Sequence, residues 1–467
     1  MSCGPRRLAL ALAGCLTTLL AIASAAAAKP LRDYAGLRVI AQRQLDSRLS
    51  EATISTPAIK GQLKVRILVP AGYRNHRRRR YPVLYLLDGT SGFASDWTTR
   101  GGAEQTTAGR PLIVVMPDIT VNGNGGGWCT DWYNGGAYGQ PKWETFHIGQ
   151  LIPWVDRNLR TVASRRGRAI AGLSQGGFCS MSYPARHPDL FSVALSYSGA
   201  PDIAYDREAQ LLVTPVINGT ETGLDRVPAN SMFGPRTSQE INWAAHDPAT
   251  LAPNLRPLKL FLFTGNGQRG PYDPLLPNPY ASGIESGAHE LNVLFHRRLG
   301  SLGIPSFYED YGGGTHIWPY WARDLRQSIG PLMADFRHPP RNPTKVNYMS
   351  AENQYSVFGW RVQMHRAVRE FSTLRGAGKH GFILLGSGSA TVITPAVYRR
   401  HARYTITIRT ASGTSSRVLR AGRNRRLKLQ VPLGPSNTVQ EYPLDGGPMG
   451  TTVFTTRVRI VRARHGH

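Results

Sequence analysis

The pattern G-x-S-x-G at residues 172–176 is the most specific chemical signal in this chain of 467 residues. It follows a short run at 168–171 that predicts a strand, and it precedes a helical pattern at 176–187. In such a strand–turn–helix the glycines allow close packing around a strained serine, whose hydroxyl is then exposed. The sequence therefore predicts Ser174 as a nucleophile, with the first N–H groups of the following helix beside it.

His316 is the best candidate for the base that a serine nucleophile requires. It lies in the glycine-rich loop 312–318, between a predicted strand at 307–311 and a predicted helix at 320–336. A loop in this position lies at the carboxyl edge of a parallel sheet, where Ser174 also emerges. We therefore expect the two side chains to meet at that edge.

The acid that orients this histidine should lie between serine and histidine in the chain, because that order goes with a serine on a strand–helix turn. Asp273, Glu285 and Glu290 all lie between a predicted strand at 258–263 and His316. Their charge does not rank them, so from the residues alone all three stay candidates.

A pair of backbone N–H groups should stabilise the oxyanion that forms when the serine attacks. The N–H of Gln175 is one, since it follows the serine directly. The apolar run 83–87 predicts a buried strand that ends in the turn Asp88-Gly89. The N–H of Thr90 is our second predicted donor, with a plain turn as the alternative for this segment.

The elements that must position these groups alternate between strand and helix, which predicts an α/β fold with a predominantly parallel sheet. Continuous apolar runs such as 112–116 are typical of strands covered on both faces. Residues 29–62 are expected to form a lead-in, and 201–257 a cap or substrate-facing excursion. The predicted strands are 63–69, 83–87, 112–116, 169–173, 193–197, 258–263 and 307–311, and the predicted helices 144–159, 176–187, 291–299 and 320–336.

A Pro-rich stretch at 338–343 marks the end of this pattern, and beyond it the apolar residues recur with a period of two. That period predicts a small all-β, sandwich-like domain at the C-terminus. Its predicted strands are 381–385, 390–393, 404–408, 427–431 and 451–461. The predicted divisions are a signal peptide (1–28), an α/β domain (29–337), a linker (338–347) and a basic β-rich domain (348–467).

The N-terminus has the pattern of an export signal. Arg6 and Arg7 precede an apolar stretch at 8–22 and a run of small residues at 23–28. A lipoprotein modified at Cys15 and a retained anchor are the alternatives. The pattern predicts a secreted or cell-envelope protein.

Cys129 and Cys179 remain in the chain once this signal is removed. In an exported protein they form either one disulfide or two buried thiols, and their spacing leaves both open. The chain has no C-x-x-C or H-x-x-x-H pattern, so we expect no metal site and no cofactor.

The formal charge of +27 is concentrated at the C-terminus. From Arg337 onward there are 22 Lys and Arg against 4 Asp and Glu, a difference of +18. In an exported protein such a charge favours an anionic envelope polymer or lipid as partner, rather than nucleic acid. A solvated basic surface without a partner is the alternative.

Several motifs resemble the esterase D superfamily of α/β-hydrolases, and within it the mycobacterial antigen 85 mycolyltransferases. The resemblance runs from about residue 63 to 336, with the order and approximate spacing of the motifs preserved. The motifs are Y-L-L-D-G at 85–89, T-D-W-Y at 130–133, K-W-E-T-F at 142–146, G-L-S at 172–174, G-N-G at 265–267 and G-T-H-I-W at 314–318.

This resemblance implies an α/β-hydrolase in which Ser174 is acylated and His316 is the base. It favours Glu285 as the acid, because the family has a glutamate at nearly the same distance before its histidine. It also implies an oxyanion donor directly after Gly89. Asp88 matches the family's trehalose-contacting aspartate, and we place it with Trp318 among the predicted substrate-binding residues.

The chain departs from the mycolyltransferases at two positions that matter for substrate. Thr90-Ser91 stands where that family has Leu-Arg, and Gln175-Gly176-Gly177 stands where it has Met-Ala-Gly. The sequence predicts an exported serine carboxylesterase or acyltransferase, with hydrolysis favoured over transfer to trehalose or another envelope sugar. A non-catalytic envelope-binding protein is the remaining alternative.

Overall fold

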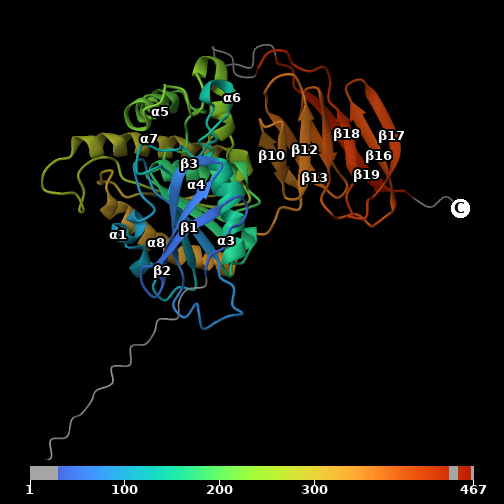
Figure 1. Ribbon diagram of the computed structural model, residues 1–467. Coiled ribbons are helices and arrows are strands. Elements are labelled where there is room, and N and C mark those ends of the chain that lie inside the picture. The colour runs from blue at the N-terminus through green and yellow to red at the C-terminus, as the bar shows by residue number, and fades with distance from the viewer. Residues whose placement is uncertain (1–29, 441–450, 464–467) are drawn as a thin grey trace, which may run out of the picture.

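A mostly parallel sheet of nine strands forms the centre of the computed structural model, which describes residues 30–440 and 451–463 (Figure 1). The predicted signal peptide, 1–28, lies outside the described residues. The strand order is β1-β2-β3-β5-β4-β6-β7-β8-β9. The first three strands are antiparallel: β1 (Arg38–Gln44), β2 (Leu49–Thr56) and β3 (Ile59–Leu68). The parallel strands are β4 (Val83–Leu87), β5 (Ile113–Pro117), β6 (Arg168–Leu173), β7 (Val193–Tyr197), β8 (Lys259–Thr264) and β9 (Phe307–Asp310).

Helices cover both faces of this sheet, and the predicted α/β fold is confirmed. Every residue of β4, β5 and β7 is buried, because alternate side chains enter two separate apolar cores. One face packs against α3 (Ile152–Asn158), α4 (Gln175–Arg186) and α7 (Pro279–Ser301). The other packs against α1 (Asp96–Thr99), α2 (Ala103–Thr106) and α8 (Trp318–Arg337).

Two segments are more ordered than the sequence predicts. The lead-in expected at 29–62 contains β1 and β2, which the apolar pattern missed because β1 is largely exposed at the sheet edge. The excursion expected at 201–257 contains α5 (Arg207–Gly219) and α6 (Arg236–His246). Proline and glycine around these helices obscured them, although Asp206 caps α5 by accepting the Glu208 N–H at 2.8 Å.

Two antiparallel sheets form the C-terminal part, at the right of Figure 1, and enclose one apolar core. The six-stranded sheet has the order β10 (Val346–Ser350), β13 (Ser372–Gly378), β14 (Gly381–Gly386), β19 (Phe454–Arg462), β16 (Arg403–Thr410) and β17 (Gly413–Arg420). The four-stranded sheet has the order β11 (Gln354–Val357), β12 (Trp360–His365), β15 (Ser389–Ile393) and β18 (Lys428–Pro432). This is the predicted sandwich-like architecture. β10 begins within the stretch 338–347 that the sequence predicts as a linker, because Val346 and Tyr348 alternate into the core.

A buried ionic contact joins the sandwich to α4. The Arg186 guanidinium binds Glu144 at 2.9 Å and Glu352, which follows β10, at 3.3 Å. The Tyr348 hydroxyl donates to the Arg186 carbonyl at 2.6 Å. The two parts of the chain are therefore joined by polar groups, of which Arg186 and Glu144 are mostly buried and Glu352 is partly exposed. No helix in the described part of the chain is long and apolar enough to cross a membrane.

Candidate active site

Ser174 occupies the sharp turn between β6 and α4, with backbone angles of φ 52° and ψ −123°. This left-handed conformation is strained for a residue with a side chain. A Cβ at Gly172 would collide with the backbone of Gly176, and a Cβ at Gly176 with the carbonyl oxygen of Asp88. The glycines of the motif are thus required for the turn, which leaves Ser174 half-buried where its neighbours are fully buried.

His316 and Glu285 form a close pair. The histidine Nδ1 lies 2.6 Å from Glu285 Oε2, and the glutamate side chain is fully buried. The other oxygen, Oε1, accepts from Ser198 Oγ at 2.7 Å, Gly265 N at 2.8 Å and Thr264 Oγ1 at 3.2 Å. The two carboxyl oxygens of Glu285 are therefore held by contacts to four surrounding groups.

The partner at Nδ1 fixes the state of the other ring nitrogen. Because a carboxylate only accepts hydrogen bonds, this contact favours the tautomer of the neutral ring in which Nδ1 carries the proton and Nε2 has the lone pair. Nε2 is buried and has no hydrogen-bond partner among the described residues. No hydrogen bond joins it to the Ser174 hydroxyl in this structure, and such contacts are often looser before substrate binds.

The sheet brings these side chains to one edge. Ser174, Ser198 and Gly265 directly follow β6, β7 and β8, whose carboxyl ends pair through Leu173, Tyr197 and Phe263. The Ser174 N–H donates to the Tyr197 carbonyl at 2.9 Å, and the Ser198 N–H to the Phe263 carbonyl at 2.8 Å. His316 follows β9, the next strand. Ser174 and the His316–Glu285 pair therefore both lie at the carboxyl edge of the parallel strands.

Two backbone N–H groups near the serine are unoccupied. Within the described residues, the N–H groups of Thr90 and Gln175 donate to no other group. Because Gly89 has no side chain, the turn before Thr90 can lie close to Ser174. A Cβ at Gly89 would lie 3.2 Å from the Ser174 Cβ. Such free donors beside a serine can stabilise an oxyanion.

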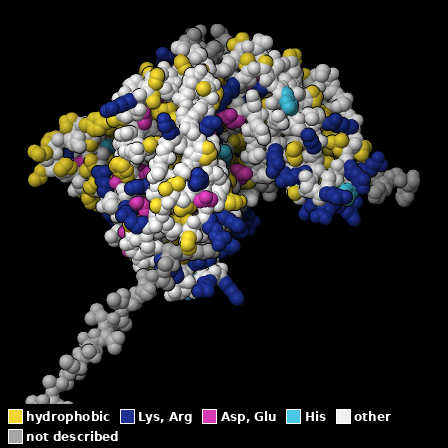
Figure 2. Space-filling view, in the orientation of Figure 1, with side chains coloured by type: hydrophobic (Ala, Val, Ile, Leu, Met, Phe, Trp, Pro, Cys, Tyr) yellow, Lys and Arg dark blue, Asp and Glu magenta, His cyan; other side chains and the backbone are white. Residues whose placement is uncertain are grey.

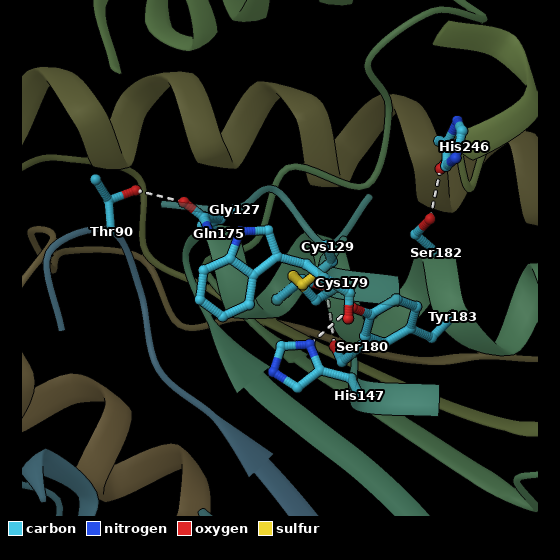
Figure 3. Close-up of a disulfide and its surroundings, with 12 residues drawn as sticks. Thr90, Gly127, Cys129, His147, Gln175, Cys179, Ser180, Ser182, Tyr183 and His246 are labelled. Atoms are coloured by element: carbon cyan, nitrogen blue, oxygen red, sulfur yellow. Dashed lines mark hydrogen bonds between the residues drawn. A yellow bond between two sulfur atoms is a disulfide. The ribbon is translucent and has the colours of Figure 1, made fainter. Parts of the chain in front are cut away.

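The side chain of Gln175 contacts both Thr90 and the loop at 127–128. Its amide lies 3.1 Å from Thr90 Oγ1 (Figure 3). With the amide nitrogen toward Thr90, its oxygen accepts from the N–H groups of Gly127 at 3.3 Å and Trp128 at 3.1 Å. Cys129 is the next residue, and it forms a disulfide with Cys179 of α4, their Cα atoms 5.5 Å apart. The bridge ties this loop to the helix that carries the serine.

The two predicted substrate-binding residues, Asp88 and Trp318, make the following contacts. Asp88 is buried in the turn before Thr90 and accepts the Gly89 N–H at 2.7 Å, and burial raises its pKa well above the ordinary range. Trp318 packs edge-on against Trp97, with the Arg100 guanidinium 5.0 Å from its ring centre.

The two rival carboxylates have other positions. Asp273 accepts from the Tyr320 hydroxyl at 2.7 Å and from Thr315, so it supports the loop before the histidine. Glu290 lies five residues beyond Glu285 on α7 and is half-buried. Of the three candidates, Glu285 is the one that the structure pairs with the ring.

Two further residues, Ser198 and Trp321, contact the pair, and neither these nor the neighbouring Asp324 were predicted. Ser198, with φ 48°, binds the glutamate and accepts from Trp321 Nε1 at 3.3 Å. The Trp321 ring lies edge-on to the His316 ring at 4.9 Å. Burial, and the nearby charge of Glu285, raise the pKa of Asp324 to about 8 despite its Arg323 partner. A serine and glycine directly after the predicted strand 193–197 were the only sequence signal for any of them.

The fold and this edge together define an α/β-hydrolase. The Esterase family model matches residues 56–331, more than half of the chain, and the chain belongs to that family. It is 34% identical over 293 residues to Esterase Rv1288 of Mycobacterium tuberculosis, covering 61% of this chain and 59% of that protein. The chain thus spans about three fifths of the length of this curated relative.

The mycolyltransferase group is also represented. The chain is 29% identical over 263 residues to diacylglycerol acyltransferase/mycolyltransferase Ag85B of Mycolicibacterium smegmatis, covering 53% of this chain and 75% of that one. The crystal structure of M. tuberculosis MPT51 superposes with a TM-score of 0.50 at 24% identity. It covers 61% of this chain and 97% of MPT51, and it supports the assignment of the fold.

Proposed function

We propose that this protein is an exported serine carboxylesterase or acyltransferase that works through an acyl-enzyme. The observation that carries the proposal is the buried His316–Glu285 pair, whose free Nε2 lies at the sheet edge where Ser174 emerges. Two relatives, one named as an esterase and one as an acyltransferase, agree with this chemistry.

In the first half-reaction, Ser174 Oγ attacks the ester carbonyl carbon and His316 Nε2 takes the hydroxyl proton. Glu285 stabilises the imidazolium that results. The N–H groups of Thr90 and Gln175 donate to the oxyanion. When the tetrahedral intermediate collapses, the C–O bond to the alcohol breaks, and the alcohol leaves with the proton from Nε2.

In the second half-reaction, a water molecule or a sugar hydroxyl attacks the acyl-serine, and His316 takes and returns a proton in the same way. We favour hydrolysis, because Thr90-Ser91 replaces the Leu-Arg pair of the mycolyltransferases and the esterase relative is the more similar of the two. Transfer to trehalose or another envelope sugar is the alternative, in which Asp88 and Trp318 would contact the substrate.

Turnover of a short nitrophenyl ester tests the catalytic proposal. We expect the wild type to hydrolyse it and the Ser174→Ala variant to retain less than about a thousandth of that rate. No turnover by the wild type would instead favour a non-catalytic envelope-binding protein. Mass spectrometry with a lipid ester and free trehalose supplied together then separates free acid from acylated sugar.

The location and organisation of the chain are proposals of the same kind. We propose removal of residues 1–28 on export, an α/β domain at 29–337, a linker and a basic domain from 348 that binds an anionic envelope polymer or lipid. N-terminal sequencing of the mature protein should begin close to residue 29. A mature protein that retains residues 1–28 would contradict this.

A further inference from the structure

The outer face of the six-stranded sheet carries a basic groove. A shallow hollow of about 730 Å³ crosses β13, β14, β19 and β16 and is lined by no acidic residue. Figure 2 shows Lys and Arg gathered over this right-hand part of the molecule. The cations that line the groove are Lys345, Arg375, Lys379, Arg409, Arg457 and Arg459, and all are exposed.

The register of the strands forces these charges together. Arg457 of β19 lies directly opposite Arg409 of β16. Arg375 is in the same row, two strands away, because both it and Arg457 pair with Ile383. Paired strands are about 4.8 Å apart, and like charges directly opposite each other destabilise a sheet.

Nothing within the described chain neutralises this repulsion. None of the six cations makes an ion pair or side-chain hydrogen bond with another described residue. The two described carboxylates of the sandwich are engaged elsewhere. Glu352 binds Arg369 at 2.6 Å, and Glu370 accepts from Ser387 Oγ at 2.6 Å. An external anion would relieve the repulsion.

The groove continues into a second basic hollow, which indicates a ligand longer than one anion. The second hollow, about 630 Å³, shares Lys379 and His380 with the first. It adds four more arginines, again without an acidic residue: Arg399, Arg400, Arg425 and Arg462. At Gly381, at the start of β14, no side chain projects into the groove. Its φ is +139°, and a Cβ there would collide with the Val458 carbonyl.

We propose that this track binds a linear polyanion with closely spaced phosphate groups, recognised by charge. Arginine outnumbers lysine in it, and the guanidinium fork matches phosphate oxygens. Phe382, Tyr398 and Tyr404, which line it, are buried, so the imidazole of His380 is the only exposed ring in the lining and the track has no row of rings for stacking successive bases. Val397 is the only exposed large apolar side chain among the described residues that line it, which disfavours insertion into a lipid bilayer. The site is separate from the proposed esterase centre.

The test is binding of the full-length mature protein to immobilised long-chain polyphosphate. The groove variant R375Q/R457Q/R459Q is compared with R77Q/R78Q/R79Q, which removes the same charge from an exposed loop. We expect the groove variant to bind about tenfold more weakly or worse, and its log–log salt slope to fall by about 3. The loop variant should bind like the wild type. Both should keep wild-type turnover of a soluble ester, if the wild type has it, and an unchanged melting temperature.

Three probes separate the polymer from other ligands. Tripolyphosphate should compete poorly, because it is too short to cover both hollows. Equal loss of binding in the two variants would show that only net charge matters, and would overturn the proposal. Tighter binding to oligothymidylate, or to phosphatidylglycerol vesicles without binding to polyphosphate, would overturn it in favour of nucleic acid or a lipid surface.

Discussion

Replacing Glu285 by glutamine changes one atom of the proposed centre and tests how the histidine is held. The Oε1 position receives three donors, of which Gly265 N is fixed in the backbone at 2.8 Å. A buried N–H left without an acceptor costs about 1–3 kcal/mol, so the glutamine oxygen should stay on that side. Its NH₂ group then faces Nδ1 of His316, where the carboxylate now lies at 2.6 Å.

An amide donor at Nδ1 makes that nitrogen an acceptor and moves the ring proton to Nε2. The ring can then no longer take the Ser174 proton. A wrong tautomer of this kind lowers kcat about ten-thousandfold, or ~5.5 kcal/mol, in a serine triad. We expect Glu285→Gln to show a loss of about 10³- to 10⁴-fold in kcat for a nitrophenyl ester, with little change in KM.

Asp273→Asn is the matched control, because Asp273 is the rival carboxylate and supports the loop before the histidine without touching the ring. It should lose less than about tenfold in kcat, and both variants should melt within a few degrees of the wild type. The reasoning is refuted if Glu285→Gln stays within tenfold of the wild type, or if Asp273→Asn falls as far.

Further predictions concern the support of the site and the fold. Ser198→Ala removes one charge-assisted bond to the buried glutamate and should lower kcat about ten- to hundredfold at constant KM. Replacing Cys129 and Cys179 by serine opens a bridge across 50 residues, and urea unfolding should show a loss of about 4 kcal/mol. Glu144→Gln should cost about 3 kcal/mol, because it leaves the buried Arg186 with less compensation. Burial opposes ionisation of Glu144, but Arg186 holds its pKa well below the ordinary 4.5. Its stabilisation is therefore present above pH 4.5 and lost as the pH falls below it, so the deficit of the variant should shrink in acid.

The strands that hold the site could be predicted where their burial is complete. β4, β5 and β7 are covered on both faces and appear in the sequence as continuous apolar runs. β1 and β2 were not predicted because they have no continuous apolar run, and β1 is mostly exposed. The helix α7 was expected only over 291–299, since its first turns contain proline, glycine and serine and are held instead by contacts at the sheet edge.

The residues of the candidate site also fall into two groups, those that a local sequence pattern can find and those that it cannot. Ser174 and His316 stand in glycine motifs that a local pattern can find. Glu285 could be selected only through the family resemblance, because which carboxylate faces the ring depends on how α7 crosses the edge of the sheet. Ser198 was missed for a similar reason, since its role arises where the ends of β7 and β8 converge. A local sequence pattern does not reveal contacts between segments that are distant in the chain.

The most direct test of the central claim is where a covalent adduct forms. The protein is treated with a fluorophosphonate, its intact mass is measured, and the modified peptide is sequenced. We predict one adduct per chain on Ser174, none on the Ser174→Ala variant, and labelling at least a hundredfold slower when His316 is replaced by glutamine. An adduct on a different residue, or undiminished ester turnover by Ser174→Ala, would contradict the account.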